Sequence, residues 1–224
     1  MKKTSILIFL IFMAYCTKPK PDTILFFGDS ITELGVKPNG YVTLIRSELN
    51  SQFPKRNIEI IGAGISGHKV PDLEARLNSD VLLKQPDIVV IYIGINDVWH
   101  SILPGHTGTS AEDFEAGLHR IIRQLKAINA DVVLCTPSVV GEKKDGSNLL
   151  DLQLDQYAEI SRNIANKENL MLIDLRKEFK SYLSVNNPAN AEKGILTYDG
   201  VHLSDKGNKF VAVMMLQQLI DIIR

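Results

Sequence analysis

Short apolar runs alternate along the chain with longer segments in which apolar residues recur every three or four positions. The runs are rich in β-branched and aliphatic residues and lie at 23–27, 58–61, 87–93, 131–135 and 170–174. None of them alternates cleanly between apolar and polar residues, so both faces of each predicted strand are expected to be buried, as in a parallel sheet. The pattern therefore predicts five buried parallel strands.

The segments between the runs have the spacing of helices. In the clearest one, at 110–130, Ser110 and Asp113 form a capping-box pattern, and apolar residues then fall on one face. A last helix is expected from about residue 204 to 223. Strand and helix alternate without an internal repeat or a linker after residue 22, so the sequence predicts one α/β domain over 23–224 with right-handed crossovers.

Length and composition agree with a single globular domain. The chain has 224 residues, of which 45% are hydrophobic and 23% are charged, values that are ordinary for a globular protein. The net charge of −1 provides no basic field, so no nucleic-acid partner is expected. Two lysine-containing runs, at 18–20 and 142–146, are expected to be solvated surface. Cys135 lies within an apolar run and is expected to be a small buried hydrophobic residue.

The amino terminus has the pattern of an export signal. Two lysines precede an apolar run that ends at Cys16 and is too short to span a membrane comfortably. The arrangement resembles a bacterial lipoprotein signal, which predicts a signal peptide at 1–15, lipidation of Cys16, a tether at 16–22 and a location in the cell envelope. Tyr15 departs from that pattern, because such signals have a small residue there. Ordinary cleavage with release and an uncleaved anchor remain the alternatives.

Polar residues and glycines follow four of the five predicted strands. In an open parallel sheet, ligands bind outside the carboxyl ends of the strands. These ends are followed by Gly28-Asp29-Ser30, by the letters GAGISG at 62–67, by Gly94 to Asp97, and, at a longer remove, by Asp199 and His202. Four loops therefore bring chemistry-bearing residues to one edge, which predicts a reaction site there.

These residue types suit nucleophilic catalysis. The hydroxyl of Ser30 needs a base, and a histidine such as His202 titrates in the right range. Asp199 stands three residues before His202 and can bind its far ring nitrogen, which fixes the tautomer. The backbone N–H groups of Ser30 and Gly67 and the side-chain amide of Asn96 are candidate donors to an oxyanion.

Four sequence blocks together resemble the SGNH hydrolases, also called the GDSL esterase/lipase family. The blocks FFGDSIT, GISGHK, GIND and DGVHLS stand in the family's order, and the likeness runs from about residue 23 to the end. The resemblance implies a flavodoxin-like three-layer α/β/α sandwich with a five-stranded parallel sheet. It also implies ester hydrolysis through an acyl-enzyme without a cofactor. Carried over by position, Ser30 is the nucleophile, Gly67 and Asn96 complete the oxyanion hole, His202 is the base and Asp199 orients it.

The resemblance leaves the substrate open. The chain departs from many relatives at His68, where they often have aspartate, and at Leu203, where many have proline. A serine ester hydrolase acting on a small-molecule, glycan or lipid acyl ester is predicted. A carbohydrate O-acetylesterase and a lysophospholipase or thioesterase are the narrower alternatives. A non-catalytic glycan-binding protein of the envelope is the alternative of a different class, and no oligomeric state is predicted.

Two other interpretations of the motifs are less favoured. The letters at 62–67 match the dinucleotide-binding pattern, which requires an acidic residue about 20 positions on, at the end of the next strand. Asp87 begins its strand, and Asp97 lies 30 residues past Gly67. An α/β-hydrolase has the same order of serine, aspartate and histidine, but it requires G-x-S-x-G around the serine, and that pattern is missing at Ser30.

The remaining polar residues near the motifs are assigned structural roles. Asp29 is expected to brace the turn before the serine, and Asp97 is also expected to be structural. Trp99 and His100 follow Asn96 and either line a substrate cleft or pack inside. No metal is expected, because the histidines lack the i, i+4 spacing of zinc hydrolases and no cysteine cluster assists them.

Overall fold

The computed structural model describes residues 22–223 and contains a five-stranded, all-parallel sheet. Its strands are β1 (Asp22–Gly28), β2 (Ile58–Gly64), β3 (Ile88–Tyr92), β4 (Asp131–Cys135) and β5 (Met171–Ile173). They stand in the order β2-β1-β3-β4-β5, with every neighbouring pair parallel. This is the flavodoxin-like strand order, so the predicted fold class is confirmed.

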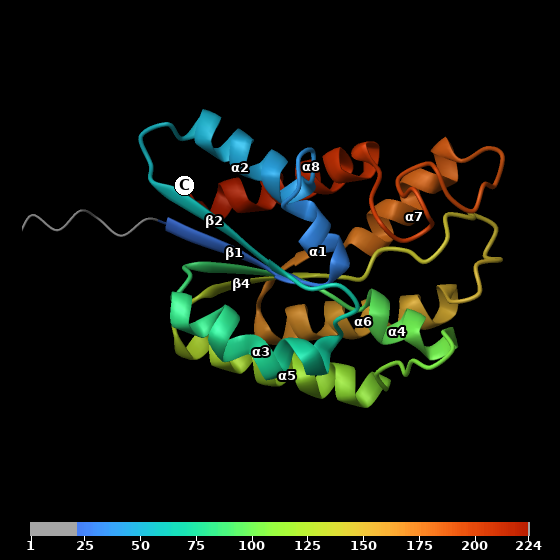
Figure 1. Cartoon of the computed structure of the whole chain (residues 1–224), viewed down its shortest axis with the longest axis horizontal. Coiled ribbons are helices and arrows are strands. Elements are labelled where there is room, and N and C mark those ends of the chain that lie inside the picture. Colours follow the sequence, from blue (N-terminus) through green and yellow to red (C-terminus); the bar gives the residue numbers. More distant parts are fainter. Residues whose placement is uncertain (1–21, 224) are drawn as a thin grey trace, which may run out of the picture.

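Helices cover both faces of the sheet, which makes three layers (Figure 1). One face carries α1 (Ser30–Gly35), α2 (Tyr41–Gln52), α7 (Leu175–Asn186) and α8 (Asp205–Ile223). The other carries α3 (Val70–Asp80), α4 (Ile95–Trp99), α5 (Ala111–Ala127) and α6 (Asp151–Glu168). Two short 3₁₀ turns, η1 (Leu82–Lys84) and η2 (His100–Ile102), complete the elements.

The burial of the central strands explains their unbroken apolar sequences. Ile24 to Phe27 of β1 are fully buried, and so are Val89 to Ile91 of β3, because helices pack on both faces of each strand. On α5, the buried residues recur at three- and four-residue spacing, and the Ser110 hydroxyl accepts a hydrogen bond from Asp113 N at 3.1 Å. The capped amphipathic helix predicted at 110–130 is therefore present, although it ends at Ala127.

The register of the sheet brings the ends of three strands together. Gly28 at the end of β1 stands opposite Gly64 of β2 and Tyr92 of β3. The loops that follow these strands therefore leave the sheet side by side at one edge. β2 is longer than the predicted run at 58–61, because it pairs with β1 along its whole length, through the glycines.

Some predictions concern residues outside the described range, and one within it is wrong. The signal peptide at 1–15, the lipidation of Cys16 and the tether before Asp22 lie outside residues 22–223. Within that range, no helix is both long enough and apolar enough to cross a membrane. The run at 142–146 was expected to be solvated, but Glu142 is fully buried, because its carboxylate is enclosed by backbone N–H groups.

Candidate active site

Ser30 lies at the junction between β1 and α1, directly after the capping residue. Asp29 is the N-cap of α1, and its Oδ1 accepts a hydrogen bond from Ile31 N at 2.9 Å. The brace predicted for Asp29 is therefore present, and Ser30 is left as the first residue of the helix, free of a capping role. Ser30 is buried except for a small accessible area, as a nucleophile at the floor of a site requires.

Asp29 and the neighbouring Asp97 are buried carboxyl groups with altered acidity. Burial raises the pKa of Asp29 to about 7, although the hydrogen bond from Ile31 N opposes the rise. Burial likewise raises the pKa of Asp97 to about 6, against a hydrogen bond from Val70 N at 3.0 Å. The hydrogen bond from Val70 N links α4, which contains Asp97, to the start of α3, and this is the structural role expected for Asp97.

The segment before α8 brings His202 to Ser30. His202 Nε2 lies 2.9 Å from Ser30 Oγ, and His202 Nδ1 lies 2.7 Å from Asp199 Oδ2. With the proton on Nδ1 bonded to the carboxylate, Nε2 is left as an acceptor that faces the hydroxyl. The structure thus brings the predicted serine, histidine and aspartate into one hydrogen-bonded row.

The second oxygen of Asp199 fixes its own turn. Asp199 Oδ1 accepts hydrogen bonds from the backbone N–H groups of Val201 at 3.0 Å and His202 at 2.7 Å. Partial burial alone would raise the pKa of Asp199, but the hydrogen bonds from the side chain and backbone of His202 and from Val201 outweigh it. The pKa is therefore held below its usual value, so that Asp199 is an anion at neutral pH.

The segments that follow β2 and β3 leave the sheet beside the end of β1, from which Ser30 follows. A side chain at Gly64 would collide with the backbone of α1 at Glu33 N, so glycine is required for this close packing. Gly67 has a φ of 77°, in the left-handed region that favours glycine. Asn96 Nδ2 donates to His68 O at 3.1 Å, which ties the first turn of α4 to the residue after Gly67. Close packing thus explains Gly64 and the left-handed backbone conformation explains Gly67, two of the three glycines that match a dinucleotide pattern.

Arg76 of α3 joins the first two loops and was missed from the sequence. Its guanidinium donates to Gly28 O at 2.7 Å and to Ala63 O at 2.9 Å, and it lies 4.5 Å from the centre of the Phe27 ring. It therefore supplies hydrogen-bond donors to carbonyl oxygens at the ends of β1 and β2, close in sequence to Ser30 in the case of Gly28. No sequence signal singles it out, since an arginine on an amphipathic helix ordinarily points to solvent.

Two aromatic rings flank His202. The Trp99 ring stands edge-on to the imidazole with 6.5 Å between ring centres, and the Tyr198 ring stacks on it at 5.7 Å. Tyr198 is 56% exposed and was not singled out in the sequence. Of the two residues that follow the Asn96 motif, Trp99 borders open space, whereas His100 is buried and packs against His106.

A groove of about 410 Å³ is bordered by Trp99 and Asp199. Its apolar lining includes Trp99, Ile102 and Leu149. Polar lining is supplied by Lys143, Ser147, Asn148 and Glu192. Among residues 22–223, no group of three or more histidine, cysteine or acidic side chains is arranged to hold a metal ion. The groove therefore offers a preformed space for an organic group next to the histidine.

Comparisons with known proteins agree with this geometry. The profile of the GDSL-like lipase/acylhydrolase family matches residues 26–210. An acetylxylan esterase from Geobacillus stearothermophilus is 32% identical over 213 residues, which cover 88% of this chain and 94% of that protein. The crystal structure of an acetyl xylan esterase, AlAXEase, is similar with a TM-score of 0.85 and 47% identity, over 88% of this chain and 98% of that one.

Solved structures of Axe2, an acetylxylan esterase from Geobacillus stearothermophilus, include three catalytic mutants. In them a serine, a histidine or an aspartate is replaced by alanine, and the aspartate precedes the histidine by three positions. Their TM-scores to this chain are 0.77 or 0.78 at 29% or 30% identity, over 88% of this chain and 93% of Axe2. Asp199 and His202 have the same spacing.

Proposed function

The chain belongs to the GDSL-like lipase/acylhydrolase family and is a serine ester hydrolase, and from this premise we propose that it removes acetyl groups from sugars. Acetylated xylooligosaccharides are the proposed substrate class. The contact that carries the proposal is the one between His202 Nε2 and Ser30 Oγ at 2.9 Å, backed by the bond from His202 to Asp199. It supports the assignment of Ser30 as nucleophile, His202 as base and Asp199 as its partner.

Acylation follows from these positions. Ser30 Oγ attacks the acetyl carbonyl carbon while its proton passes to His202 Nε2, and Asp199 stabilises the imidazolium that forms. The carbonyl oxygen becomes an oxyanion, for which the N–H groups of Ser30 and Gly67 and the amide of Asn96 are the proposed donors. The tetrahedral intermediate then collapses, the bond to the sugar oxygen breaks, and this oxygen takes the proton from His202 Nε2.

Deacylation repeats the sequence with water. A water molecule attacks the acetyl-serine while His202 Nε2 accepts one of its protons, and the same donors hold the second oxyanion. Collapse breaks the bond to Ser30 Oγ, which recovers its proton from His202, and acetic acid leaves and ionises to acetate in the solvent. Every proton is thus returned, and the reaction requires no group beyond those of the chain and water.

Asn96 has one amide hydrogen to spare for this role. Its Nδ2 donates to His68 O at 3.1 Å, and an amide nitrogen carries two hydrogens. The bond to His68 fixes the plane of the amide, so the second hydrogen has a defined direction. This arrangement favours an oxyanion donor that needs no rearrangement when charge develops.

The groove beside Asp199 supports a sugar as the leaving group. A pyranose ring has apolar C–H faces and polar edges, and the groove is lined both by apolar residues, Trp99, Ile102 and Leu149, and by polar ones. Asp199 borders the groove and binds His202, from which the leaving oxygen must collect a proton. The names of the similar proteins, which are acetylxylan esterases, favour an acetylated xylooligosaccharide over other sugar esters.

Acetate release from acetylated xylooligosaccharides tests the proposal. The wild-type protein should release acetate, and Ser30→Ala should not. A series of p-nitrophenyl esters from acetyl to decanoyl should show a maximum at acetyl. Rising activity with chain length, together with no release from the sugar, would instead indicate a lipid ester substrate.

We also propose that the chain is exported and anchored to a membrane through lipid on Cys16. β1 begins at Asp22, at the edge of the sheet opposite to Ser30, and a strand of seven residues is about 23 Å long. An anchor attached before Asp22 would therefore join the domain at the end of β1 that is remote from the active site, which leaves the site accessible to a soluble glycan. Mass spectrometry of the membrane fraction should find Cys16 as a diacylated amino terminus; an unmodified, released protein would contradict this.

A further inference from the structure

Glu142 is a fully buried carboxylate that the proposed reaction does not use. It lies between β4 and α6, in a run of charged residues, and its side chain turns inward. Glu142 Oε1 accepts hydrogen bonds from Leu196 N at 2.6 Å and Thr197 N at 2.7 Å, and Oε2 accepts one from Ile195 N at 2.7 Å. Three successive N–H groups therefore converge on one carboxylate.

The residues that Glu142 binds lead directly to Asp199 and His202. They belong to the segment between α7 and α8, which has no strand of its own to hold it. Thr197 Oγ1 accepts a hydrogen bond from Gly200 N at 3.1 Å, and Thr197 forms an antiparallel bridge with Leu203. The position of Thr197 thus sets the turn that contains Asp199, Gly200 and His202.

The backbone beside Glu142 holds the same segment. Gly141 N donates to Gly200 O at 2.8 Å, and Glu142 N donates to Glu192 O at 2.8 Å. Asn187 Nδ2 in turn donates to Glu142 O at 2.8 Å. The segment before α8 is therefore fastened to Glu142 and its neighbour at several points, on both sides of Asp199.

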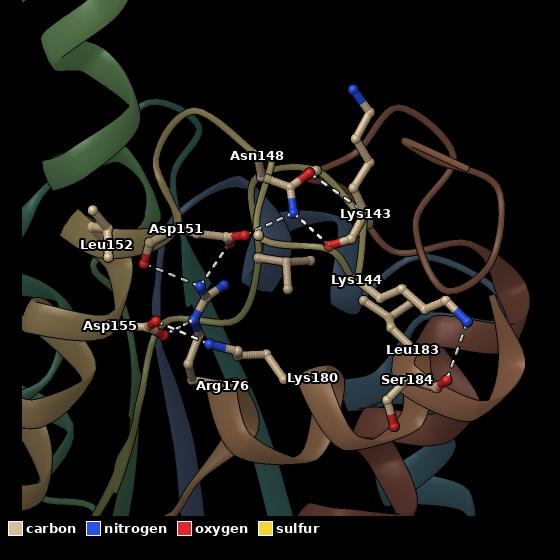
Figure 2. A pocket seen from close by; sticks show the side chains of 13 residues that line it. Lys143, Lys144, Asn148, Asp151, Leu152, Asp155, Arg176, Lys180, Leu183 and Ser184 are labelled. Carbon is tan, nitrogen blue, oxygen red and sulfur yellow. Dashed lines mark hydrogen bonds and ion pairs between the residues drawn. The ribbon is translucent and has the colours of Figure 1, made fainter. Parts of the chain in front are cut away.

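The loop that carries Glu142 is itself anchored on its far side, in the cavity of Figure 2. Asn148 Nδ2 bridges Lys143 O at 2.7 Å and Asp151 Oδ2 at 2.9 Å. Arg176, buried at the start of α7, donates to Asp151 Oδ1 at 2.7 Å and to Ser138 O at 3.0 Å. These contacts join the loop to the starts of α6 and α7, so Glu142 projects from a fixed support.

We propose that Glu142 is a positioning residue, whose carboxylate holds Ile195 to Thr197 so that His202 is presented to Ser30. The inference rests on the proposed roles of Ser30, Asp199 and His202. Hydrogen bonds to an ionised acceptor are stronger than those between neutral groups, and three of them concentrate here on a segment without regular structure. A displacement of about 1 Å at a catalytic group can cost on the order of 100-fold in rate.

Glu142→Gln tests the proposal, because it keeps the shape and removes the charge. The remaining side-chain oxygen can still accept hydrogen bonds from Leu196 N and Thr197 N. The new amide N–H groups would face the N–H of Ile195, which then has no acceptor on this side chain. With p-nitrophenyl acetate, kcat should fall about 10- to 100-fold while KM changes less than about threefold. The rate at which a fluorophosphonate labels Ser30 should fall by the same factor as kcat.

Asp174→Asn is the matched control for loss of a structural carboxylate. Asp174 caps α7 through Lys177 N, binds Arg162 and accepts a hydrogen bond from Thr136 Oγ1, and these partners lie outside the segment 195–197 that Glu142 holds. This variant should lower the melting temperature while kcat and the labelling rate stay within about twofold of wild type. A Glu142→Gln protein that behaves in the same way, with a lower melting temperature but unchanged kcat and labelling, would overturn the proposal.

A second variant covers failure of Glu142→Gln to fold. Glu142→Asp keeps the charge but shortens the side chain by one methylene, and the same criteria of kcat, KM and labelling apply to it. Unchanged kcat and labelling in this variant, beside an unfolded Glu142→Gln, would also overturn the proposal. Failure of the proposed function is recognised separately, since Ser30→Ala would then retain esterase activity whatever the Glu142 variants do.

Discussion

His202 Nε2 stands 2.9 Å from Ser30 Oγ, although 172 residues separate the two in the chain. The serine is placed by the first strand and its capped helix, and the histidine by a segment just before the last helix. No local element joins them. Their contact therefore depends on the whole sheet and on the bonds that hold the segment before α8.

Asp199→Asn should lower kcat strongly and leave the fold intact. The asparagine oxygen can still accept hydrogen bonds from the backbone N–H groups of Val201 and His202. Its amide N–H, however, would donate to His202 Nδ1 and favour the tautomer with the proton on Nε2, which cannot accept the proton of Ser30. A fall in kcat of about 10³- to 10⁴-fold is expected, as for other triads of this kind. Kinetics with p-nitrophenyl acetate check it. A folded variant with the kcat of wild type, or a loss of activity that is explained by unfolding of the variant, would contradict the tautomer argument.

Asn96→Ala should lower kcat about 10²- to 10³-fold with little change in KM, because it removes a donor to the oxyanion. The same substitution also removes the bond to His68 O, so a control for that bond is needed. Comparison with Asn96→Asp provides it: the carboxylate also loses the bond to His68 O but in addition repels the oxyanion, so this variant should be less active than Asn96→Ala. An aspartate variant as active as wild type would rule out the donor role.

The stability of the protein should depend on pH through Asp29. Burial raises its pKa in the folded state to about 7, from an ordinary 3.8, with the nearby Asp97 charge adding to the rise. Between these values the folded state binds more protons than the unfolded one, so the contribution of this group to the free energy of unfolding falls as pH rises. Asp29→Asn removes this loss and keeps an acceptor for Ile31 N.

Urea denaturation at pH 5 and pH 8 measures this effect. At pH 5 the folded state keeps the Asp29 proton that the unfolded state has largely lost, so the asparagine variant should already be more stable than wild type, by about 2 kcal/mol. At pH 8 the asparagine variant should be more stable than wild type, by at most about 4 kcal/mol. A difference in free energy of unfolding that is the same at both pH values would show that Asp29 has no raised pKa.

Leu149→Ala should weaken the binding of sugar substrates. Leu149 is 80% exposed and lines the groove beside Asp199, so its truncation removes apolar contact without opening the core. Loss of about 1 kcal/mol of contact corresponds to a rise of roughly fivefold in KM for acetylated xylooligosaccharides. Leu152→Ala is the matched control, because Leu152 is 88% exposed but lines the neighbouring cavity of Figure 2 and not the groove. Equal KM values for both variants would count against the groove as the sugar site.

Much of the fold and the site could be predicted from the sequence because the signals are local. Runs such as 23–27 and 87–93 are apolar on both faces, and this alone indicates buried strands whose carboxyl ends share an edge. Asp199 and His202 are three residues apart, so their contact could be anticipated from spacing. Ser30, Gly67 and Asn96 follow three strands that are neighbours in the sheet, and the family resemblance assigned a role to each of them.

The residues that support the site could not be predicted, since their partners are distant in sequence. Glu142 stands among lysines and was expected at the surface, but it is buried because it binds N–H groups 53 to 55 positions further on. Arg76 and Arg176 are likewise held by carbonyl and carboxylate oxygens from other elements. A charged side chain is buried only where such partners exist, and only the folded structure reveals them.

Labelling with a fluorophosphonate, followed by peptide mass spectrometry, tests the central assignment most directly. The wild-type protein should lose esterase activity in step with a single phosphonyl adduct on Ser30, and His202→Ala should react at least about 10³-fold more slowly. Full inactivation with the adduct on another residue, or equal labelling of the histidine variant, would contradict the account.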